Sequence, residues 1–324
     1  MAAKIWSTQQ KVVEEVFFQN EAVSLCLLIN RRARTMRVID FRAGPTSAKR
    51  LFVLSLAQRE GVEKAYTLVE RDEVQTWLKL GFAKEGTIPG FYKRSDAFLL
   101  GCSVRAPGRE VPLEATAKAD EGDDGAPLES EMRITAVKPS GAAPLSPAQE
   151  LMERTIATAK REVKDPTEAL PQARIAPGRE ADARKAVAVA VRNGRALTAF
   201  EPFGRDVERS FFVATTRGGF ELHVSTEAQG CFGNAFLEIL VAPRTPAERA
   251  GTAAAVKAFG ERLQAEGVVT CFSLTPSDDV ALAVAFLHGG FRRTGLLLGH
   301  LVVGNRRKDA IVWSRKLANP AEET

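Results

Sequence analysis

A set of short sequence motifs that occurs twice places the strongest constraint on the fold of this chain. The stretch 79–102, KLGFAKEGTIPGFYKRSDAFLLGC, has a partner in the stretch 289–317, GGFRRTGLLLGHLVVGNRRKDAIVWSRKL. Gly-Phe begins at Gly81 in the first and at Gly290 in the second, and another glycine follows five residues later in both. An Asp-Ala pair before an apolar run also recurs. A spacing of about 200 residues is too long for a solenoid, so the pattern predicts two copies of one domain.

The sequence that precedes each copy repeats as well. Residues 56–62, LAQREGV, match residues 263–268, LQAEGV, and both follow apolar residues at helical spacing. A glycine after such a pattern is a common helix end, and the apolar run after it is typical of a strand. Any α/β protein contains some of these short motifs by chance, but here four matched features occur in the same order. Each half is therefore expected to contain helix, strand, helix, Gly-Phe and two strands.

The composition is that of a globular protein. The chain has 324 residues, enough for two domains, and 45% of them are hydrophobic. No apolar run approaches the length of a bilayer span. The first residues lack the apolar core of a signal peptide and continue into polar sequence. We therefore expect a cytoplasmic protein without a membrane partner.

The cysteines and the charge balance argue against two classes of site. Cys26, Cys102, Cys231 and Cys271 are scattered and form no CxxC pair, which predicts reduced thiols and no metal site. The formal net charge of +5 can attract phosphates, but it is too small an excess to predict binding of nucleic acid.

In the first half, residues 1–104, a helix is expected to precede a hairpin and an α/β unit. The segment Ser7–Asn20 has the pattern of an amphipathic helix, with Ser7 as cap and Val12, Val16 and Phe17 on one face. The elements expected after it are strands at 22–30 and 35–41, a helix at 46–60, a strand at 62–69, a helix at 72–80 and strands at 83–92 and 97–104.

Residues 105–178 differ in composition from both flanking halves. They are rich in Ala, Pro, Gly and acidic residues, and they include the cluster 120–124. Such a segment cannot bury enough apolar surface to offset its ordering entropy, so we expect a disordered acidic linker. Ser146, Pro147 and Gln149 form a capping-box pattern with Pro at the first helical position. They predict one helix at 147–163, a possible docking segment for a protein partner.

The second half, residues 179–317, is followed by a tail at 318–324. Its expected elements are a helix at 180–192, strands at 196–203, 209–216, 220–226 and 235–241, a helix at 247–266, a strand at 268–274, a helix at 276–288 and two closing strands. The fold class expected for the chain is therefore α/β (α+β), with two mixed-sheet domains joined by the linker.

This order of elements resembles the GNAT fold of acyl-CoA-dependent N-acyltransferases. The resemblance covers 179–317 more fully and 22–104 partially. The stretch 86–101, GTIPGFYKRSDAFLLG, resembles the closing strands of β-lysine N-acetyltransferase-type enzymes. In the family, a loop with the pattern R/Q-x-x-G-x-G/A opens the helix after the fourth strand. Its backbone N–H groups and the positive helix end hold the pyrophosphate of acetyl-CoA. The resemblance implies tandem GNAT-like domains and acetyl-CoA as co-substrate.

The loop in the second half is VAPRTPAERAGTA at 241–253. With Gly251 as the first glycine of the motif, Glu248 takes the Arg/Gln position and faces the pyrophosphate unfavourably. With Gly251 as the second glycine, Arg249 takes the place of the first. In the first half, Pro45 stands where a glycine is expected and removes an N–H donor. The resemblance therefore implies cofactor binding only in the second copy, at Leu240, Val241, Arg249, Ala250, Gly251, Thr252 and Ala253.

Candidate catalytic groups lie on two neighbouring strands of the second half. The tyrosine by which the family protonates the leaving thiolate is replaced by Trp77 and Phe286, neither of which can do so. Glu238, on the strand before the loop, is the candidate general base, and the alternative is that it points to solvent. Cys271 and Ser273 are candidates for the acid, and the alternative is that both are core residues.

Two functions are compatible with these residues. In the first, the chain is an acetyl-CoA-dependent N-acetyltransferase that acts on a primary amine of a small molecule or a protein, with the C-terminal copy active. In the alternative, both copies have lost catalysis, and the protein is a GNAT-like interaction or regulatory module.

Overall fold

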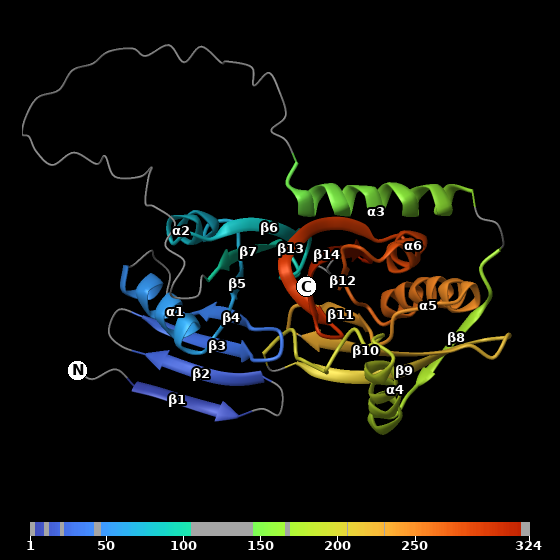
Figure 1. The fold of residues 1–324 in the computed structure, drawn as a ribbon, viewed down its shortest axis with the longest axis horizontal. Coiled ribbons are helices and arrows are strands. Elements are labelled where there is room, and N and C mark those ends of the chain that lie inside the picture. Colours follow the sequence, from blue (N-terminus) through green and yellow to red (C-terminus); the bar gives the residue numbers. More distant parts are fainter. Residues whose placement is uncertain are drawn as a thin grey trace, which may run out of the picture.

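The computed structural model describes residues 4–9, 13–19, 23–41, 47–104, 145–165, 169–205, 207–229 and 231–318. Within these ranges a single mixed sheet of 14 strands runs through both halves of the chain, with order β1-β2-β3-β4-β5-β7-β6-β13-β14-β12-β11-β10-β9-β8 (Figure 1). The expected disordered linker at 105–144 lies outside the described residues.

The first half forms one end of this sheet. Its elements are β1 (Lys4–Gln9), β2 (Val13–Gln19), β3 (Ser24–Asn30), β4 (Thr35–Asp40), α1 (Ser47–Arg59), β5 (Lys64–Val69), α2 (Val74–Lys79), β6 (Ala83–Ile88) and β7 (Ala97–Ser103). Strands β4 and β5 are parallel, and the other neighbouring pairs in this half are antiparallel.

The helix expected at Ser7–Asn20 is wrong, because the described residues of this segment are the strands β1 and β2. β2 pairs with β3 in antiparallel register, with Phe17 opposite Cys26. The β-branched and aromatic side chains of this segment suit a strand. One charged residue, Glu15, is buried between apolar neighbours and bonds to Arg205 of the second half. Pairing with a neighbouring strand therefore outweighed the helical spacing of the apolar residues.

The second half forms the other end of the sheet. Its elements are α3 (Pro147–Lys164), β8 (Ala173–Pro177), α4 (Glu180–Arg192), β9 (Glu208–Thr216), β10 (Glu221–Gln229), β11 (Asn234–Ile239), α5 (Pro246–Ala265), β12 (Thr270–Pro276), α6 (Val280–His288), β13 (Arg292–Val303) and β14 (Arg306–Lys316). β8 was not expected from the sequence, and it pairs with β9. The strand expected at 196–203 is reduced to a single bridge between Ala196 and Val241.

The two halves repeat one order of strands and join where β6 pairs with β13. In each half a parallel pair, β4–β5 or β11–β12, is followed by an antiparallel closing pair. The halves meet at Gly86 and Gly295, the two glycines that correspond in the sequence repeat. A Cβ atom on Gly295 would lie 2.5 Å from the Gly86 Cα atom. Glycine at this crossing therefore permits the close backbone approach that continues the sheet from one half to the other.

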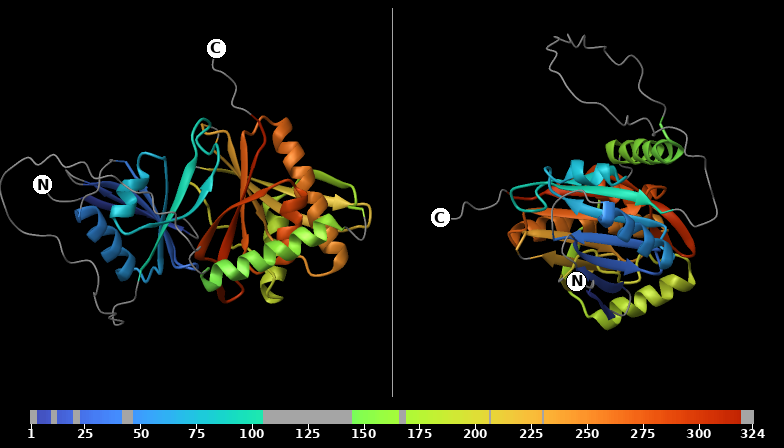
Figure 2. Two further views of the ribbon diagram at one scale, coloured as in Figure 1. Left: turned by 90° about the horizontal axis from the view of Figure 1, so that it is seen from above. Right: turned by 90° about the vertical axis from the view of Figure 1, so that its left-hand side faces the viewer.

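The helices α1, α2, α5 and α6 cover one face of the sheet (Figures 1 and 2). The opposite face of the sheet buries a third core that is shared by both halves. Its aromatic members include Tyr66 and Phe91 of the first half and Phe203, Phe236 and Phe272 of the second. Since the halves share this core as well as the sheet, they form one packed body.

Helix α3 forms where its capping box predicts a helix. The Ser146 side chain accepts from the Gln149 N–H, and the Gln149 side chain accepts from the Ser146 N–H. Its buried residues, which include Met152 and Ile156, belong to the core that contains α5 and α6. The apolar face of α3 is thus covered by this chain itself rather than available to a partner. None of the helices in the described ranges is long and apolar enough to cross a membrane.

Candidate active site

The two parallel strands of the second half separate at their carboxyl ends. β11 and β12 pair only from Asn234–Thr270 to Phe236–Phe272. Beyond this point β11 continues to Ile239 and β12 to Pro276 without pairing to each other. The carboxyl ends of parallel strands are where α/β sheets commonly bind ligands. The diverging ends of β11 and β12 are therefore the place to look for a site.

Glu238 lies on β11 just past the point of divergence. Its neighbours Leu237 and Ile239 belong to the core under α5 and α6, whereas Phe236 belongs to the shared core on the opposite face. Because side chains alternate along a strand, Glu238 points to the face away from α5. It is not solvent-exposed, since only 13% of its side chain is accessible. The alternative in which Glu238 points to solvent therefore does not hold.

Burial raises the pKa of Glu238 to about 7. The Arg209 guanidinium, 3.7 Å from the carboxylate, and hydrogen bonds from Thr198 and Ser225 oppose this shift. The Ser225 hydroxyl donates to Glu238 Oε2 at 2.7 Å. A carboxyl group with a pKa near neutrality can accept and release a proton at physiological pH, which is the requirement for a general base.

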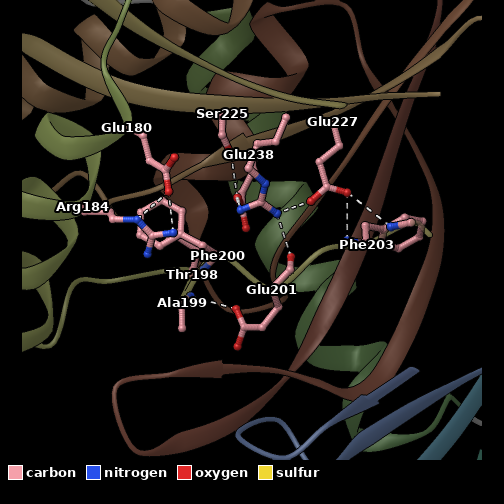
Figure 3. Close-up of polar contacts among 12 residues, drawn as sticks. Glu180, Arg184, Thr198, Ala199, Phe200, Glu201, Phe203, Ser225, Glu227 and Glu238 are labelled. Carbon is pink, nitrogen blue, oxygen red and sulfur yellow. Dashed lines mark hydrogen bonds and ion pairs between the residues drawn. The ribbon is translucent and has the colours of Figure 1, made fainter. Parts of the chain in front are cut away.

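Further charged side chains surround Glu238 (Figure 3). Arg209 on β9 forms an ion pair with Glu227 on β10 and donates to the Glu201 carbonyl at 2.9 Å. The Glu227 carboxylate also accepts from the backbone N–H groups of Phe203, at 2.9 Å, and Gly204, at 3.3 Å. One guanidinium therefore stands between two carboxylates and holds the irregular segment after α4 against the sheet.

A cavity next to Glu238 is lined by residues of both halves. Tyr66 from β5, Glu201, and His300 from β13 contribute to its wall together with Glu238. The ring of Tyr66 meets the His300 imidazole edge-on, with centroids 4.7 Å apart. Of these groups only Glu238 was expected from the sequence. The others were missed because they come from strands that only the tertiary structure brings together.

The N-terminus of α5 carries a capping box. Thr245 Oγ1 accepts from the Glu248 N–H at 3.2 Å, and Glu248 Oε2 accepts from the N–H groups of Arg244, at 2.6 Å, and Thr245, at 3.2 Å. The Arg195 guanidinium donates to the same carboxylate at 2.7 Å. Pro246 is the first helical residue and has no N–H. The carboxylate of Glu248 thus occupies the Arg244 and Thr245 amides, which would otherwise be free to bind an anion.

The residues expected to contact a cofactor lie mostly beyond this first turn. Arg249, Ala250, Gly251, Thr252 and Ala253 are within α5, where the helix engages backbone N–H groups, as in the bond from Arg249 N–H to the Thr245 carbonyl.

Gly251 and its neighbour are buried in the helix packing. A Cβ atom on Gly251 would overlap the Phe220 ring, so this glycine permits close packing of the helix. Thr252 is fully buried, and its Oγ1 has no hydrogen-bond partner among the described residues. Leu240 is also buried, packed beside α4, and Val241 forms the bridge to Ala196.

The two candidate acids do not face Glu238. Cys271 belongs to the core on the helix side of the sheet, and Ser273, two residues on, points to the same side. Burial raises the pKa of the Cys271 thiol well above its usual range. Ser273 is fully buried, and its Oγ lacks a partner within the described part of the chain. The structure therefore separates both residues from the base by the thickness of the sheet.

The residues at the tyrosine positions of the family are core residues. Phe286 and Trp77 are both fully buried. Phe286 stacks on Trp313, with centroids 5.7 Å apart, and Trp77 meets Phe82 edge-on. Neither side chain can act as the acid that protonates a thiolate.

No protein-family model and no curated protein matches the sequence. Among solved structures, the fold is similar to the ribosomal-protein-S18-alanine N-acetyltransferase from Escherichia coli, with 18% identity and a TM-score of 0.35. That match covers 47% of this chain and 99% of the other. It is also similar to spermidine N-acetyltransferase from Vibrio cholerae, in complex with CoA and spermine, with 13% identity and a TM-score of 0.38, covering 46% and 97%.

Proposed function

We propose that the C-terminal half transfers an acetyl group from acetyl-CoA to a primary amine, with Glu238 as the general base. The observation that carries this proposal is the buried Glu238 carboxylate, with a pKa of about 7, at the point where β11 leaves β12. In the reaction, Glu238 takes a proton from the ammonium form of the acceptor, and the free amine attacks the thioester carbonyl. The C–N bond forms, the C–S bond breaks, and the thiolate of CoA takes up the proton that the former amine nitrogen releases, while Glu238 returns its proton to solvent.

The second copy is the better candidate for the active one. Ile39 stands in β4 four residues after the first residue paired to β5, and Glu238 stands at the same place in β11 relative to β12. The first half thus has an apolar residue where the second has the base. We infer that the two halves descend from one duplicated unit, and that the first now serves the second by completing its sheet and its shared core.

Acetyl-CoA would enter between the ends of β11 and β12, with its phosphates at the N-terminus of α5. Arg195, Arg244 and Arg249 supply positive charge there, but the Glu248 carboxylate already accepts from the amides of Arg244 and Thr245. A phosphate must displace this carboxylate, so the proposed affinity for acetyl-CoA is weak. Amines of small molecules and of proteins are both compatible acceptors.

A second candidate function is that of a GNAT-like interaction or regulatory module without catalysis. It is favoured by the Glu248 side chain on the α5 amides and by the fully buried Phe286 at the tyrosine position. In this alternative, the Arg209–Glu227–Glu238 group serves only to hold the segment after α4 on the sheet.

Titration with acetyl-CoA followed by an amine-acetylation assay separates the two functions. The enzyme hypothesis predicts heat of binding, a raised melting temperature and an activity that rises with pH as Glu238 loses its proton near pH 7. The Glu238→Gln variant should bind acetyl-CoA like the native protein and lose acetyl transfer. Absence of binding at millimolar acetyl-CoA would leave the interaction module as the remaining function.

A further inference from the structure

The parallel strands of the first half also diverge, and a pocket opens between their carboxyl ends. β4 and β5 pair as far as Val38 and Thr67, and both strands continue past this point. The pocket has a volume of about 600 Å³, against about 80 Å³ for the cavity beside Glu238. Ile39 lines it at the place that corresponds to Glu238 in the second half. The pocket therefore has the size of a small-molecule site but lacks the base, which indicates binding rather than acetyl transfer.

Arg37 is the least satisfied charged group in the wall of this pocket. The residue is 8% exposed and forms no ion pair within the described part of the chain. Its Nη1 donates to the Phe203 carbonyl, and its guanidinium carbon lies 5.3 Å from the centre of the Phe203 ring. Nε is enclosed and has no partner among the described residues, whereas Nη2 likewise has none there but is not enclosed. A buried charge without a counter-charge is costly, so the open Nη2 points to an anion from outside the chain.

The carboxylates on the elements around Arg37 are already neutralised by other cations. Their ion pairs are Glu15–Arg205, Asp40–Lys49, Glu201–Arg32 and Glu227–Arg209. Two of these residues, Arg205 and Asp40, also line the pocket. Because the two charges of each pair lie in contact, the pairs add little net charge to the pocket. Arg37 thus remains as the cation of the described wall that a ligand can neutralise.

Glu73 limits the charge that such a ligand can carry. It lines the pocket and forms no ion pair with the described residues. Burial raises the pKa of Glu73, and the carboxylates of Asp40 and Asp72 raise it further, so Glu73 lies on the Asp40 side of the pocket. Asp40 and Arg37 are three residues apart in β4 and point to opposite faces of the sheet. A single negative charge can therefore meet Arg37 away from Glu73, whereas a ligand with several negative charges would also meet this carboxylate.

Aromatic rings form the apolar part of the wall. Phe91, Tyr92 and Phe232 contact one another, with ring centroids between 4.9 and 6.0 Å apart. Phe41, at the end of β4, also lines the pocket and is 52% exposed. The ring of a ligand can pack edge-on or offset against such a cluster. With one unpaired cation beside these rings, the wall suits an aromatic ring that carries one carboxylate.

We infer that this pocket binds a small aromatic monocarboxylate, with its carboxylate on Arg37 and its ring against Phe91, Tyr92 and Phe232. The inference goes beyond the proposed acetyl transfer, since it assigns a ligand to the half that lacks the base. It also explains why a guanidinium with a single hydrogen bond is kept in a buried position, where its other donors cost free energy.

Isothermal titration calorimetry of the full chain, without any CoA, tests the site with three probes. Phenylacetate should bind saturably at one site. Phenethyl alcohol has the same ring and chain length without the charge, and it should bind about tenfold more weakly or less, because a charge-assisted hydrogen bond is lost. Inorganic phosphate supplies charge without the ring and should not displace phenylacetate.

Two substitutions test the part of Arg37. Arg37→Met should weaken phenylacetate binding about tenfold or more, whereas Arg31→Met should leave it unchanged. Arg31 is the matched control, because it belongs to the same half, lies outside the pocket wall and has 55% of its side chain exposed. Without ligand, Arg37→Met should unfold at the same urea concentration as the native chain or a higher one, since it removes an unpaired buried charge. A lower midpoint with unchanged affinity would identify a purely structural arginine and overturn the inference.

The thiol of Cys231 reports where the probe binds. Cys231 is exposed and lies in the pocket wall, whereas Cys102 lies outside it. Phenylacetate should slow the reaction of Cys231 with N-ethylmaleimide in the native chain and leave that of Cys102 unchanged, as followed by mass spectrometry of the two peptides. This measurement decides even if Arg37→Met does not fold. The inference is overturned if millimolar phenylacetate does not bind, if phenethyl alcohol binds equally well, if phosphate displaces phenylacetate, or if binding leaves the reactivity of Cys231 unchanged.

Discussion

Replacing Glu248 by Gln should strengthen the binding of CoA. In the native chain this carboxylate accepts hydrogen bonds from the N–H groups of Arg244 and Thr245 and from the Arg195 guanidinium. Burial raises the pKa of Glu248, but these contacts outweigh burial and lower it, so the group is ionised. A phosphate of CoA that approaches the N-terminus of α5 must displace a bound anion.

The magnitude follows from the kind of contact that is weakened. Glutamine also fits the capping box, so α5 should keep its N-terminus, but its amide oxygen is neutral. Charge-assisted hydrogen bonds are about twice as strong as neutral ones. If the displaced contacts together contribute about 3 kcal/mol, the Glu248→Gln change lowers the cost of displacement by about 1.5 kcal/mol. That corresponds to a roughly tenfold lower Kd for CoA.

Isothermal titration calorimetry with CoA measures this difference. Glu261→Gln provides the matched control, because it makes the same charge change on the same helix, 13 residues along the chain and roughly 20 Å from Glu248. The control should bind CoA as the native chain does. Equal affinities of the native and Glu248→Gln proteins would show that this carboxylate does not compete with the phosphates. Binding by neither protein would place the CoA site elsewhere or remove it.

Three further predictions concern stability, measured by urea unfolding. Since the folded state holds the pKa of Glu238 near 7 rather than 4.5, it binds more protons than the unfolded chain between these values, and stability is lost as pH rises through this window. Glu238→Gln should therefore be more stable than the native protein by about 3 kcal/mol at pH 8 and equal to it near pH 4; a gain that is independent of pH would contradict the shift. Gly251→Ala should cost about 1–3 kcal/mol, because its methyl group overlaps the Phe220 ring. Gly295→Ala should destabilise the junction of the halves by at least as much, whereas Gly218→Ala, with nothing within 4 Å, should change little; a similar loss at both glycines would refute the argument from close approach.

Much of the fold was predictable because it depends on neighbours in the sequence. Helical spacing before a glycine and apolar runs after it predicted α1, β5, α5 and β12 within a few residues. The start of α3 was likewise predictable, because its capping box consists of Ser146 and Gln149, three residues apart, with Pro147 between them. The repeat predicted the same order of elements in both halves, and the structure confirms an α/β fold with that order.

The helix expected at Ser7–Asn20 shows the limit of local patterns. Its apolar spacing fits a helix, yet residues 13–19 are a strand because β3 offers a full set of backbone partners. The strand also buries Glu15, which no periodicity predicts, because a partner for its charge comes from Arg205, 190 residues away.

The sequence by itself determined the two α/β halves, the absent tyrosine and the candidate base, since these depend on residue type and on spacing along the chain. Only the tertiary structure decided that the halves share one sheet through Gly86 and Gly295 and that α3 packs on its own chain. It also decided that Glu238 faces a cavity walled by Tyr66 and His300, while Cys271 and Ser273 face the other side of the sheet. The physical reason is that burial and charge pairing depend on which faces meet, and these faces come from strands in different halves of the chain.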